Sequence, residues 1–184
     1  LYGIRPDLMT IAKGLSSGYL PIGGVMVGDR VADVLIEKGG EFAHGYTYSG
    51  HPVACAVASA NLALIEQEGL VPRTRDDTGP YLASKWRELA GHPLVGEARS
   101  IGLIGALELV RDKATRRFFD KRGEVGGICR DFCFQNGLIM RAVRDTMIIA
   151  PPLVIDRGQL DELAEKAWRC LDLTLERCRA EGRL

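Results

Sequence analysis

The sequence predicts a mixed α/β protein, in which the end of an α/β domain in residues 1–70 precedes a small α+β domain in residues 71–184. In the first part, short apolar runs are separated by turn-rich loops and helical patterns. After about Leu70 the composition changes, and charged amphipathic segments alternate with strand-like runs. The first residues already have the pattern of the middle of a fold, so we expect the chain to be the C-terminal part of a longer protein.

Short apolar runs at Leu8–Ala12 and Gly24–Val27 predict two buried strands. The segment between them is rich in turn-forming residues and therefore predicts a loop. We expect Asp29 to cap a helix that runs to about Lys38 and ends at Gly39-Gly40.

Pro52 opens the next predicted helix, which runs to about Gln67. Proline at the first helical position and a glycine beyond the last one, here Gly69, are typical of helix ends. Small apolar residues lie on nearly every side of this helix, so we expect it in a core or at a subunit interface.

The second part predicts helices at both ends and strands between them. Residues 71–89 have a helical pattern, with a kink or break expected at Gly79-Pro80. The remaining expected elements are strands at Val95–Arg99, Leu103–Arg111, Leu138–Ala142 and Met147–Ala150, the last two joined by a turn at Arg144-Asp145, and a helix at Ile128–Gln135 that ends at Asn136-Gly137. The last helix has one apolar face with Leu160, Leu163, Ala164, Ala167, Leu171 and Thr174 at helical spacing.

Charge and cysteine content exclude several classes of protein. Lys+Arg and Asp+Glu both number 24, so no overall field draws the chain to nucleic acid or to an anionic membrane. No apolar run approaches the roughly 20 residues of a membrane span. Cys129 and Cys133 share a helix face but lack the further ligands of a structural zinc site. We expect reduced, mostly buried cysteines, a cytoplasmic protein and no metal site.

Lys13 lies directly after the first apolar run and before Gly14. A lysine at this place projects from a strand end into a loop crevice, where α/β folds bind ligands. Partial desolvation would favour the neutral amine, whose lone pair can form an imine with a carbonyl cofactor. The alternative is an ordinary surface lysine, which is the more frequent case for such a position taken alone.

The loop Tyr46–His51 leads into the helix that begins at Pro52. A helix N-terminus offers free N–H groups and the positive end of the dipole, so a phosphate binds there readily. The Thr47 hydroxyl would add another donor. The alternative is that Thr47 or Ser49 caps only its own helix.

Arg141 interrupts the apolar strand pattern Leu138–Ala142. A guanidinium in that setting requires a carboxylate, and its fork suits bidentate binding. The carboxylate can belong to a substrate or to an acidic residue of the protein, and the residues alone leave both open.

Three segments, taken together, carry a family resemblance. Pro6–Leu15 with Gly18–Gly24 resembles the cofactor-lysine segment of the class III (omega) aminotransferases, which depend on pyridoxal 5'-phosphate. His44–Pro52 resembles the phosphate-binding loop of that family, and Gly137–Arg141 followed by Ala150–Leu153 resembles its substrate-arginine segment. The segments lie in the family's order and cover essentially the whole chain, and they look closest to the putrescine– and omega-amino acid–pyruvate aminotransferases.

The resemblance implies a fold-type I transferase, with part of its large cofactor-binding domain in residues 1–70 and its small C-terminal domain in residues 71–184. Lys13 would hold the cofactor as a Schiff base and then act as general acid and base of the proton shift. Tyr46 and Thr47 would bind the cofactor, with Thr47 at its phosphate across a subunit boundary. A homodimer or larger homo-oligomer with a shared active site is therefore implied. Arg141 would hold a substrate carboxylate, and Tyr19 would line the substrate pocket.

The family also requires an acidic residue at the pyridine nitrogen, a Gly/Ser phosphate loop and an aromatic ring on the cofactor. All three belong upstream of Leu1, and none is found in this sequence. Asp7 is expected to cap or to pair locally instead. The stretch alone is therefore expected to be a poor catalyst.

The implied reaction moves an amino group from an omega-amino acid, a diamine or another amine to pyruvate or a similar keto acid. One alternative is an aminomutase or decarboxylase of the same fold, and a requirement for a keto acid distinguishes these from a transaminase. Another is a catalytically incompetent fragment that acts only in assembly, which predicts that the purified full-length protein shows no cofactor absorbance.

Overall fold

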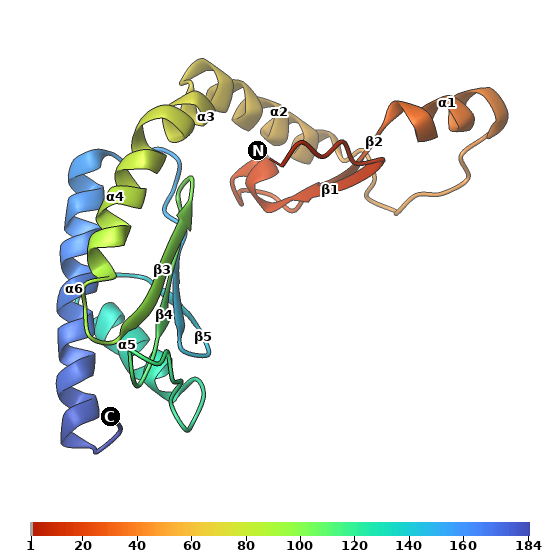
Figure 1. The fold of residues 1–184 in the computed structure, drawn as a ribbon. Helices are drawn as coiled ribbons and strands as arrows, with labels where there is room; N and C mark the ends of the chain where they lie inside the picture. Colours follow the sequence, from red (N-terminus) through yellow and green to blue (C-terminus); the bar gives the residue numbers. More distant parts are fainter. Residues whose placement is uncertain (1) are drawn as a thin grey trace. The chain divides into compact units, whose positions relative to one another are not determined.

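The computed structural model describes residues 2–184 and shows a mixed α/β protein that divides into two compact units at Gly69/Leu70 (Figure 1). The elements are, in order, β1 (Leu8–Ala12), the 3-10 helix η1 (Lys13–Ser16), β2 (Gly23–Val27), α1 (Asp29–Lys38), α2 (Pro52–Gln67), α3 (Leu70–Arg73), the π-helix η2 (Thr74–Thr78), α4 (Gly79–Leu89), β3 (Val95–Ile101), β4 (Ile104–Leu109), α5 (Glu124–Gln135), β5 (Arg141–Val143), β6 (Thr146–Ile149) and α6 (Arg157–Ala180). Over residues 2–184, each helix is too short or too polar to cross a membrane.

The first unit contains an antiparallel hairpin in which β1 pairs with β2, with Leu8 opposite Val27 and Ala12 opposite Gly23. The sequence correctly predicts both strands, but the prediction that they are buried is wrong for this chain. Nearly all of their residues are exposed. A two-stranded ribbon needs a packing layer to bury apolar side chains, and residues 2–69 do not cover either face of this one enough to do so.

The two helices of the first unit have the predicted extents, but one predicted cap is wrong. Gly28 is the N-cap of α1, and Asp29 is its first helical residue and makes no capping hydrogen bond. Its carboxylate still lies in the first turn, where the helix dipole favours negative charge. In α2, Ala54 and Ala58 are buried, and most other residues are exposed in this chain.

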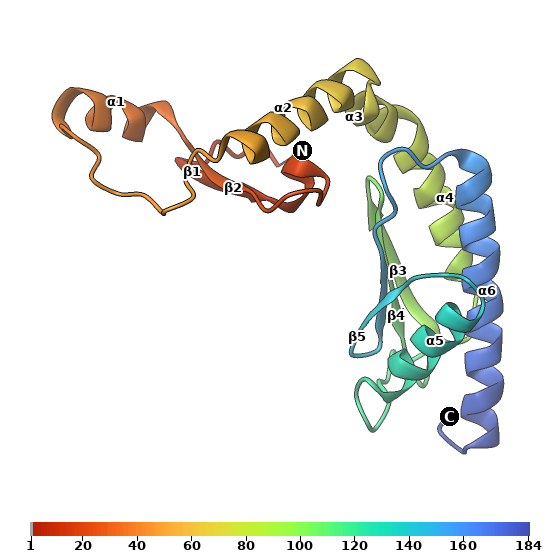
Figure 2. The ribbon, with the colours of Figure 1, turned by 180° about the vertical axis from the view of Figure 1, so that it is seen from behind.

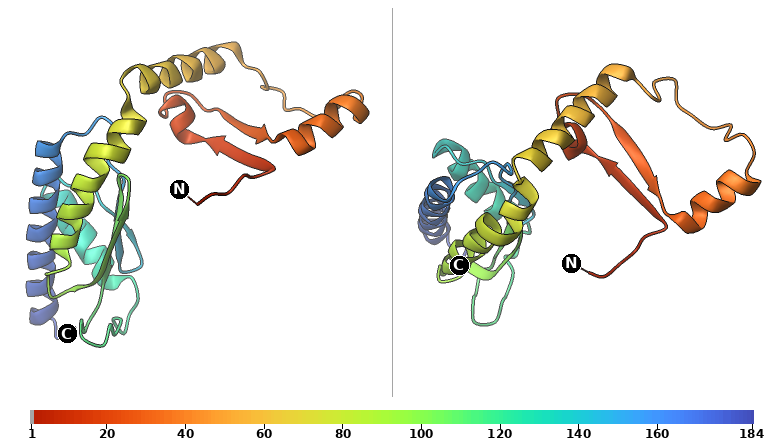
Figure 3. Two further views of the ribbon diagram at one scale, coloured as in Figure 1. Left: turned by 45° about the horizontal axis from the view of Figure 1, so that its top comes forward. Right: turned by 90° about the horizontal axis from the view of Figure 1, so that it is seen from above.

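The second unit is built on a four-stranded antiparallel sheet in the order β3-β4-β6-β5. Helices α4, α5 and α6 lie on one side of this sheet (Figures 2 and 3). Side chains alternate between its two faces, so Leu107 and Met147 are buried against the helices while Glu97 and Arg99 lie on the open face. The sheet therefore has one core face and one face that is free to carry polar groups.

Trp86 of α4 lies at the centre of this core and is 1% exposed. Its indole Nε1–H donates to the carbonyl oxygen of Ala106 at 3.0 Å. A Cβ on Gly105 would lie 2.9 Å from the indole, so only glycine lets the strand approach the ring this closely. All five cysteines are free and four of them are buried, which confirms the prediction that the thiols are mostly buried.

Contacts distant in sequence set two element boundaries that differ from the predicted ones. α5 begins at Glu124, four residues before its predicted start, because the buried Asp145 carboxylate accepts hydrogen bonds from the backbone N–H groups of Gly123 at 2.8 Å and Gly126 at 3.0 Å. β5 begins at Arg141 rather than at Leu138, because its pairing with β6 begins there, with Arg141 opposite Ile148.

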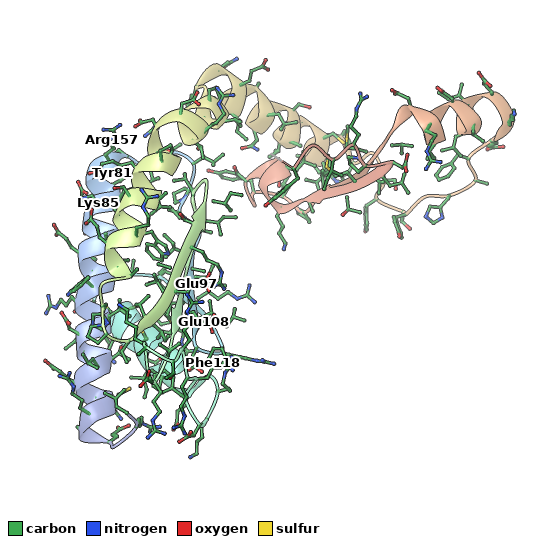
Figure 4. The ribbon with its side chains drawn as sticks, viewed as in Figure 1. Tyr81, Lys85, Glu97, Glu108, Phe118 and Arg157 are labelled. Carbon is green, nitrogen blue, oxygen red and sulfur yellow. The ribbon has the colours of Figure 1, made fainter. Side chains whose placement is uncertain are left out.

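A network of charged groups fixes the start of α6 against α4 and η2, where Tyr81, Lys85 and Arg157 gather (Figure 4). The Tyr81 hydroxyl donates to Asp161 at 2.8 Å, and the Lys85 ammonium lies 2.8 Å from the same carboxylate. The Arg157 guanidinium lies over the Tyr81 ring and pairs with Asp77 of η2 at 2.6 Å. The predicted break at Gly79-Pro80 thus takes the form of a π-helix that ends at Thr78.

His92 is fully buried in the second unit and is held in one tautomer. Its Nδ1 accepts a hydrogen bond from the backbone N–H of Leu94 at 3.2 Å, so the proton lies on Nε2, which faces Asp172 at 3.2 Å. Burial lowers the pKa of His92 from its ordinary value of 6.5, and the hydrogen bond with Asp172 opposes this shift only in part.

We expect the free energy of unfolding of the second unit to fall as the pH is lowered from 7 to 5. Because the folded-state pKa of His92 is lowered, the unfolded chain binds more protons below about pH 6.5, and the stability contributed by neutral His92 is lost as the pH falls towards the folded pKa. Both tryptophans, Trp86 and Trp168, lie in this unit, so urea unfolding followed by tryptophan fluorescence measures it. His92→Gln should flatten the pH dependence, whereas His44→Gln, at an exposed ring of the first unit, should not. Equal slopes for wild type and His92→Gln would contradict this account.

Candidate active site

Lys13 follows the last residue of β1 and begins the 3-10 helix η1, at the strand end that the sequence predicts. Its φ is +52°, in the left-handed region, which costs a non-glycine residue about 1–2 kcal/mol. The side chain is exposed and makes no ion pair with any carboxylate of residues 2–184. The partial desolvation expected for this amine is thus not supplied by the described residues, and the amine is free of internal partners.

Hydrogen bonds from two serines and one asparagine hold the turn that follows Lys13. The Ser16 hydroxyl donates to the carbonyl oxygen of Leu20 at 2.6 Å. The Asn61 amide of α2 donates to Gly14 and Leu15 carbonyl oxygens at 3.0 and 3.1 Å, and its Oδ1 accepts from the Ser17 hydroxyl at 2.7 Å. Asn61 is not among the residues singled out from the sequence; its one signal there is a side-chain amide next to the small apolar residues of a helix.

Two hollows of the first unit share one wall, the segment Leu20–Gly23. One has a volume of about 560 Å³ and is also lined by Tyr46, Tyr48, Ser49 and the first turn of α2. The other, about 700 Å³ and more open, is bordered by Lys13. Lys13 and Tyr46 therefore border adjoining spaces, while Tyr19 is 82% exposed and lines neither hollow.

The turn at residues 47–50 leaves several donors free at the start of α2. His51, not Thr47 or Ser49, caps this helix, because its Nδ1 accepts from the backbone N–H of Ala54 at 3.3 Å. Ser49 instead accepts from the backbone N–H of Tyr46 at 3.0 Å. Within the described chain, the Thr47 hydroxyl and the backbone N–H groups of Thr47, Tyr48 and Gly50 make no hydrogen bond. These groups suit a phosphate.

Arg141 is the first residue of β5, and its exposed side chain makes no ion pair in the part of the chain that the structure describes. The internal ion pair that the sequence leaves open is therefore not observed. Strand register places Arg99 in the same row of the open face, with Ala106 and Ile148 between the two arginines.

Acidic side chains on this face are engaged elsewhere. Arg99 lies 3.5 Å from Glu97 and 3.6 Å from Glu108, two glutamates on neighbouring strands (Figure 4). The Thr146 hydroxyl also donates to Glu108 at 2.8 Å. Arg141 is consequently left as a guanidinium available to a carboxylate from outside.

Asp7 forms an ion pair, as the sequence predicts, but its partner Arg30 lies on α1 rather than next to it in sequence. Arg30 donates two hydrogen bonds to its carboxylate, at 2.8 and 2.6 Å. The Arg30 guanidinium lowers the pKa of Asp7 below its ordinary value. The pair ties the entry of β1 to the first turn of α1.

Lys13, Tyr19, Tyr46 and Thr47 lie in the first unit, and Arg141 lies in the second. A lysine without an ion pair in the described chain and unpaired donors beside a helix N-terminus are the kinds of group with which a transferase of mixed α/β fold binds a phosphorylated carbonyl compound. Residues 1–171 match the aminotransferase class-III family, and the chain belongs to that family.

Relatives with named activities agree with this family. The chain is 59% identical over 173 residues to the putrescine–pyruvate aminotransferase of Pseudomonas aeruginosa, covering 94% of this chain and 38% of that protein. It is 43% identical over 187 residues to the diaminobutyrate–2-oxoglutarate transaminase of Halomonas elongata, covering 98% of this chain and 40% of that protein.

Solved structures of transaminases have the same fold over this length. A transaminase from the marine bacterium Virgibacillus superposes with a TM-score of 0.90 at 37% identity, covering 96% of this chain and 41% of the other. An (S)-enantioselective omega-transaminase from Thermomicrobium roseum superposes with a TM-score of 0.87 at 41% identity, covering 95% and 39%. The chain thus spans about two-fifths of the length of the relatives it matches.

We expect His51→Ala to weaken the start of α2 by about 1 kcal/mol, because it removes the side chain that caps the helix. His51→Asn, which keeps a capping acceptor, should retain most of this stability. Hydrogen exchange of the backbone amides of residues 53–56 measures the effect directly, since the first unit contains no tryptophan. Unchanged protection in His51→Ala would show that the cap does not stabilise this helix end.

Proposed function

We propose that this chain is the C-terminal part of a pyridoxal 5'-phosphate-dependent transaminase. The proposed reaction transfers an amino group from a diamine, an omega-amino acid or another amine to pyruvate or a similar keto acid. The observation that carries the proposal is Lys13, which follows β1 directly and makes no ion pair within residues 2–184, in the segment that resembles the cofactor-lysine segment of the family. The 59% identity to an enzyme named for putrescine and pyruvate supports the substrate class.

The proposed organisation follows the same family. Residues 1–70 would belong to the large cofactor-binding domain, residues 71–184 would form the small C-terminal domain, and the enzyme would be a cytoplasmic homodimer or larger homo-oligomer. The exposed apolar residues of β1 and β2 support the proposal that further parts of the large domain cover them, because a strand rich in apolar side chains is stable only when those side chains are covered.

Lys13 has two proposed tasks. Its Nζ would attach the cofactor covalently, which requires an amine that no carboxylate of the protein already holds. When bound, the cofactor supplies an electron sink that stabilises negative charge on the substrate carbon. After substrate displaces it, the Nζ of Lys13 would take the proton from that carbon and return it at another position, a contribution typically worth about 10²–10⁴ in rate.

The groups at the start of α2 would hold the cofactor phosphate. The free hydroxyl of Thr47 and the free backbone N–H groups of Thr47, Tyr48 and Gly50 are donors of the kind that bind phosphate at helix N-termini. Tyr46 borders the neighbouring hollow and would contact the rest of the cofactor. In the proposed oligomer, these groups would serve the Lys13 of a partner subunit.

Arg141 would bind the carboxylate of the keto acid through its two parallel N–H groups. Because no acidic residue of the described chain holds its guanidinium, the side chain can move aside when an amine without a carboxylate enters. Tyr19 would lie on the substrate side of the loop that follows Lys13.

We expect Lys13→Ala in the full-length protein to abolish borohydride-stable attachment of the cofactor and to reduce turnover by at least about 10²-fold. The fold should be retained, because the side chain is exposed and makes no ion pair within residues 2–184. Lys38→Ala, at an exposed lysine of α1, is the matched control and should behave as wild type.

Turnover of Lys13→Ala near the wild-type rate would remove Lys13 from the mechanism. Product formation by the wild-type enzyme without any keto acid would indicate an aminomutase or a decarboxylase. No cofactor absorbance in the purified full-length wild type would indicate a protein that acts only in assembly.

We expect Arg141→Ala to raise the KM for pyruvate by about ten- to a hundredfold, in keeping with the roughly 1.5–3 kcal/mol of a hydrogen bond to a charged group. The KM for an amine donor without a carboxylate should stay near the wild-type value. Arg130→Ala, at an exposed arginine of α5 that pairs with Asp131, is the control in the same unit. Equal losses for pyruvate and for the amine would contradict the role proposed for Arg141.

A further inference from the structure

Asn61 forms three hydrogen bonds to the turn that carries Lys13, across 44 to 47 residues of sequence. Its Nδ2 donates to the carbonyl oxygens of Gly14 at 3.0 Å and Leu15 at 3.1 Å. Its Oδ1 accepts from the Ser17 hydroxyl at 2.7 Å. Every hydrogen-bonding group of this side-chain amide is thus directed to the four residues that follow Lys13.

The turn needs support from outside because its own backbone is unfavourable. Lys13 and Ser17, at its two ends, have φ values of +52° and +50°, in the left-handed region that side chains other than glycine rarely adopt. The 3-10 helix that begins at Lys13 and ends before Ser17 is four residues long, and no side chain caps its N-terminus. A conformation of this kind persists only when surrounding contacts hold it.

α2 is the element that supplies this support. Ala54 and Ala58 are its buried residues, and Asn61 lies on the same face, three residues after Ala58. Figure 3 shows α2 running alongside the turn at Lys13–Ser16. Asn61 therefore holds Gly14, the residue that follows Lys13, in a fixed position relative to α2.

We propose that Asn61 is a positioning residue, which fixes the direction in which Lys13 leaves the end of β1. The inference rests on the proposed role of Lys13 as the lysine that binds the cofactor. Asn61 contacts the backbone of the turn, so it acts on the amine through residues 14, 15 and 17 only. Loss of its hydrogen bonds leaves the lysine in place but lets the turn adopt other conformations.

This role has a specific kinetic consequence. A reacting group displaced by about 1 Å can lose on the order of 10²-fold in rate, whereas ground-state binding through other residues is unaffected. We therefore expect Asn61→Ala to lower kcat by about ten- to a hundredfold, with the KM values for amine and keto acid near those of wild type. We also expect slower covalent capture of added cofactor by Lys13 in the apoprotein.

Three variants in the full-length protein separate the contributions. Asn61→Ala removes all three hydrogen bonds. Asn61→Asp keeps the shape and the acceptor for Ser17, but it loses both donors and brings negative charge next to two carbonyl oxygens. Ser17→Ala removes one hydrogen bond and leaves both donors in place, so its effect should be the smallest.

Asn136→Ala is the matched control, because the Asn136 amide donates to a backbone carbonyl, that of Phe132, at 2.8 Å in the second unit. Three readouts are compared in all four variants: kcat and KM, the rate of borohydride-stable labelling of Lys13 in apoprotein given cofactor, and the midpoint of thermal unfolding. The pH dependence of the absorbance of the lysine-bound cofactor is a fourth, which a purely structural role would not change.

A lower kcat with unchanged KM, slower labelling and a shifted pH dependence in Asn61→Ala and Asn61→Asp, but not in Asn136→Ala, would support the proposal. Wild-type kcat and labelling in a folded Asn61 variant would overturn it, as would parallel changes in Asn136→Ala. If Asn61→Ala does not fold, Asn61→Asp and Ser17→Ala decide in the same way. Absence of label on Lys13 in the wild type would instead overturn the proposed function itself.

Discussion

The reaction proposed for Lys13 requires its amine to be presented in one direction, and β1 leads at this point into a short turn whose two end residues, Lys13 and Ser17, have left-handed φ values. The turn places Lys13 on the border of an open hollow. It is costly for the backbone, so hydrogen bonds from Ser16 and from Asn61 of α2 are needed to maintain it. α2 is therefore involved in both features of the first unit. Free donors lie just before its start, and Asn61, near the middle of this helix, supports the turn.

In the second unit, Arg141 has no ion-pair partner among residues 2–184, although it lies on a surface that also carries acidic side chains. Cross-strand register keeps Glu97 and Glu108 within reach of Arg99, on the far edge of the sheet from Arg141. Thr146 holds Glu108 further. The opposite face of the same strands forms the core with Trp86. The charged side chains therefore stay on the open face, where they avoid the desolvation cost of buried charge.

The elements that the sequence predicts well are those determined by neighbouring residues. Pro52 at the first position of α2 and the apolar run of β1 act locally, and both elements have the predicted bounds. Features that depend on distant partners could not be predicted in this way. The early start of α5 depends on Asp145, and β1 is exposed because residues 2–69 supply no layer that covers it. The cap of α2 is local, yet it is His51 rather than Thr47 or Ser49 that makes the hydrogen bond.

Four of the five thiols are enclosed in the second unit, and the remaining one, Cys55, is exposed on the wall of the 560 Å³ hollow. In the described chain this separates the cysteines by accessibility, so a mild alkylating reagent would modify one position and leave the others intact. The Cys55 thiol lies about one helical turn from the Thr47–Gly50 segment, so the rate at which it is alkylated would report whether that hollow is filled.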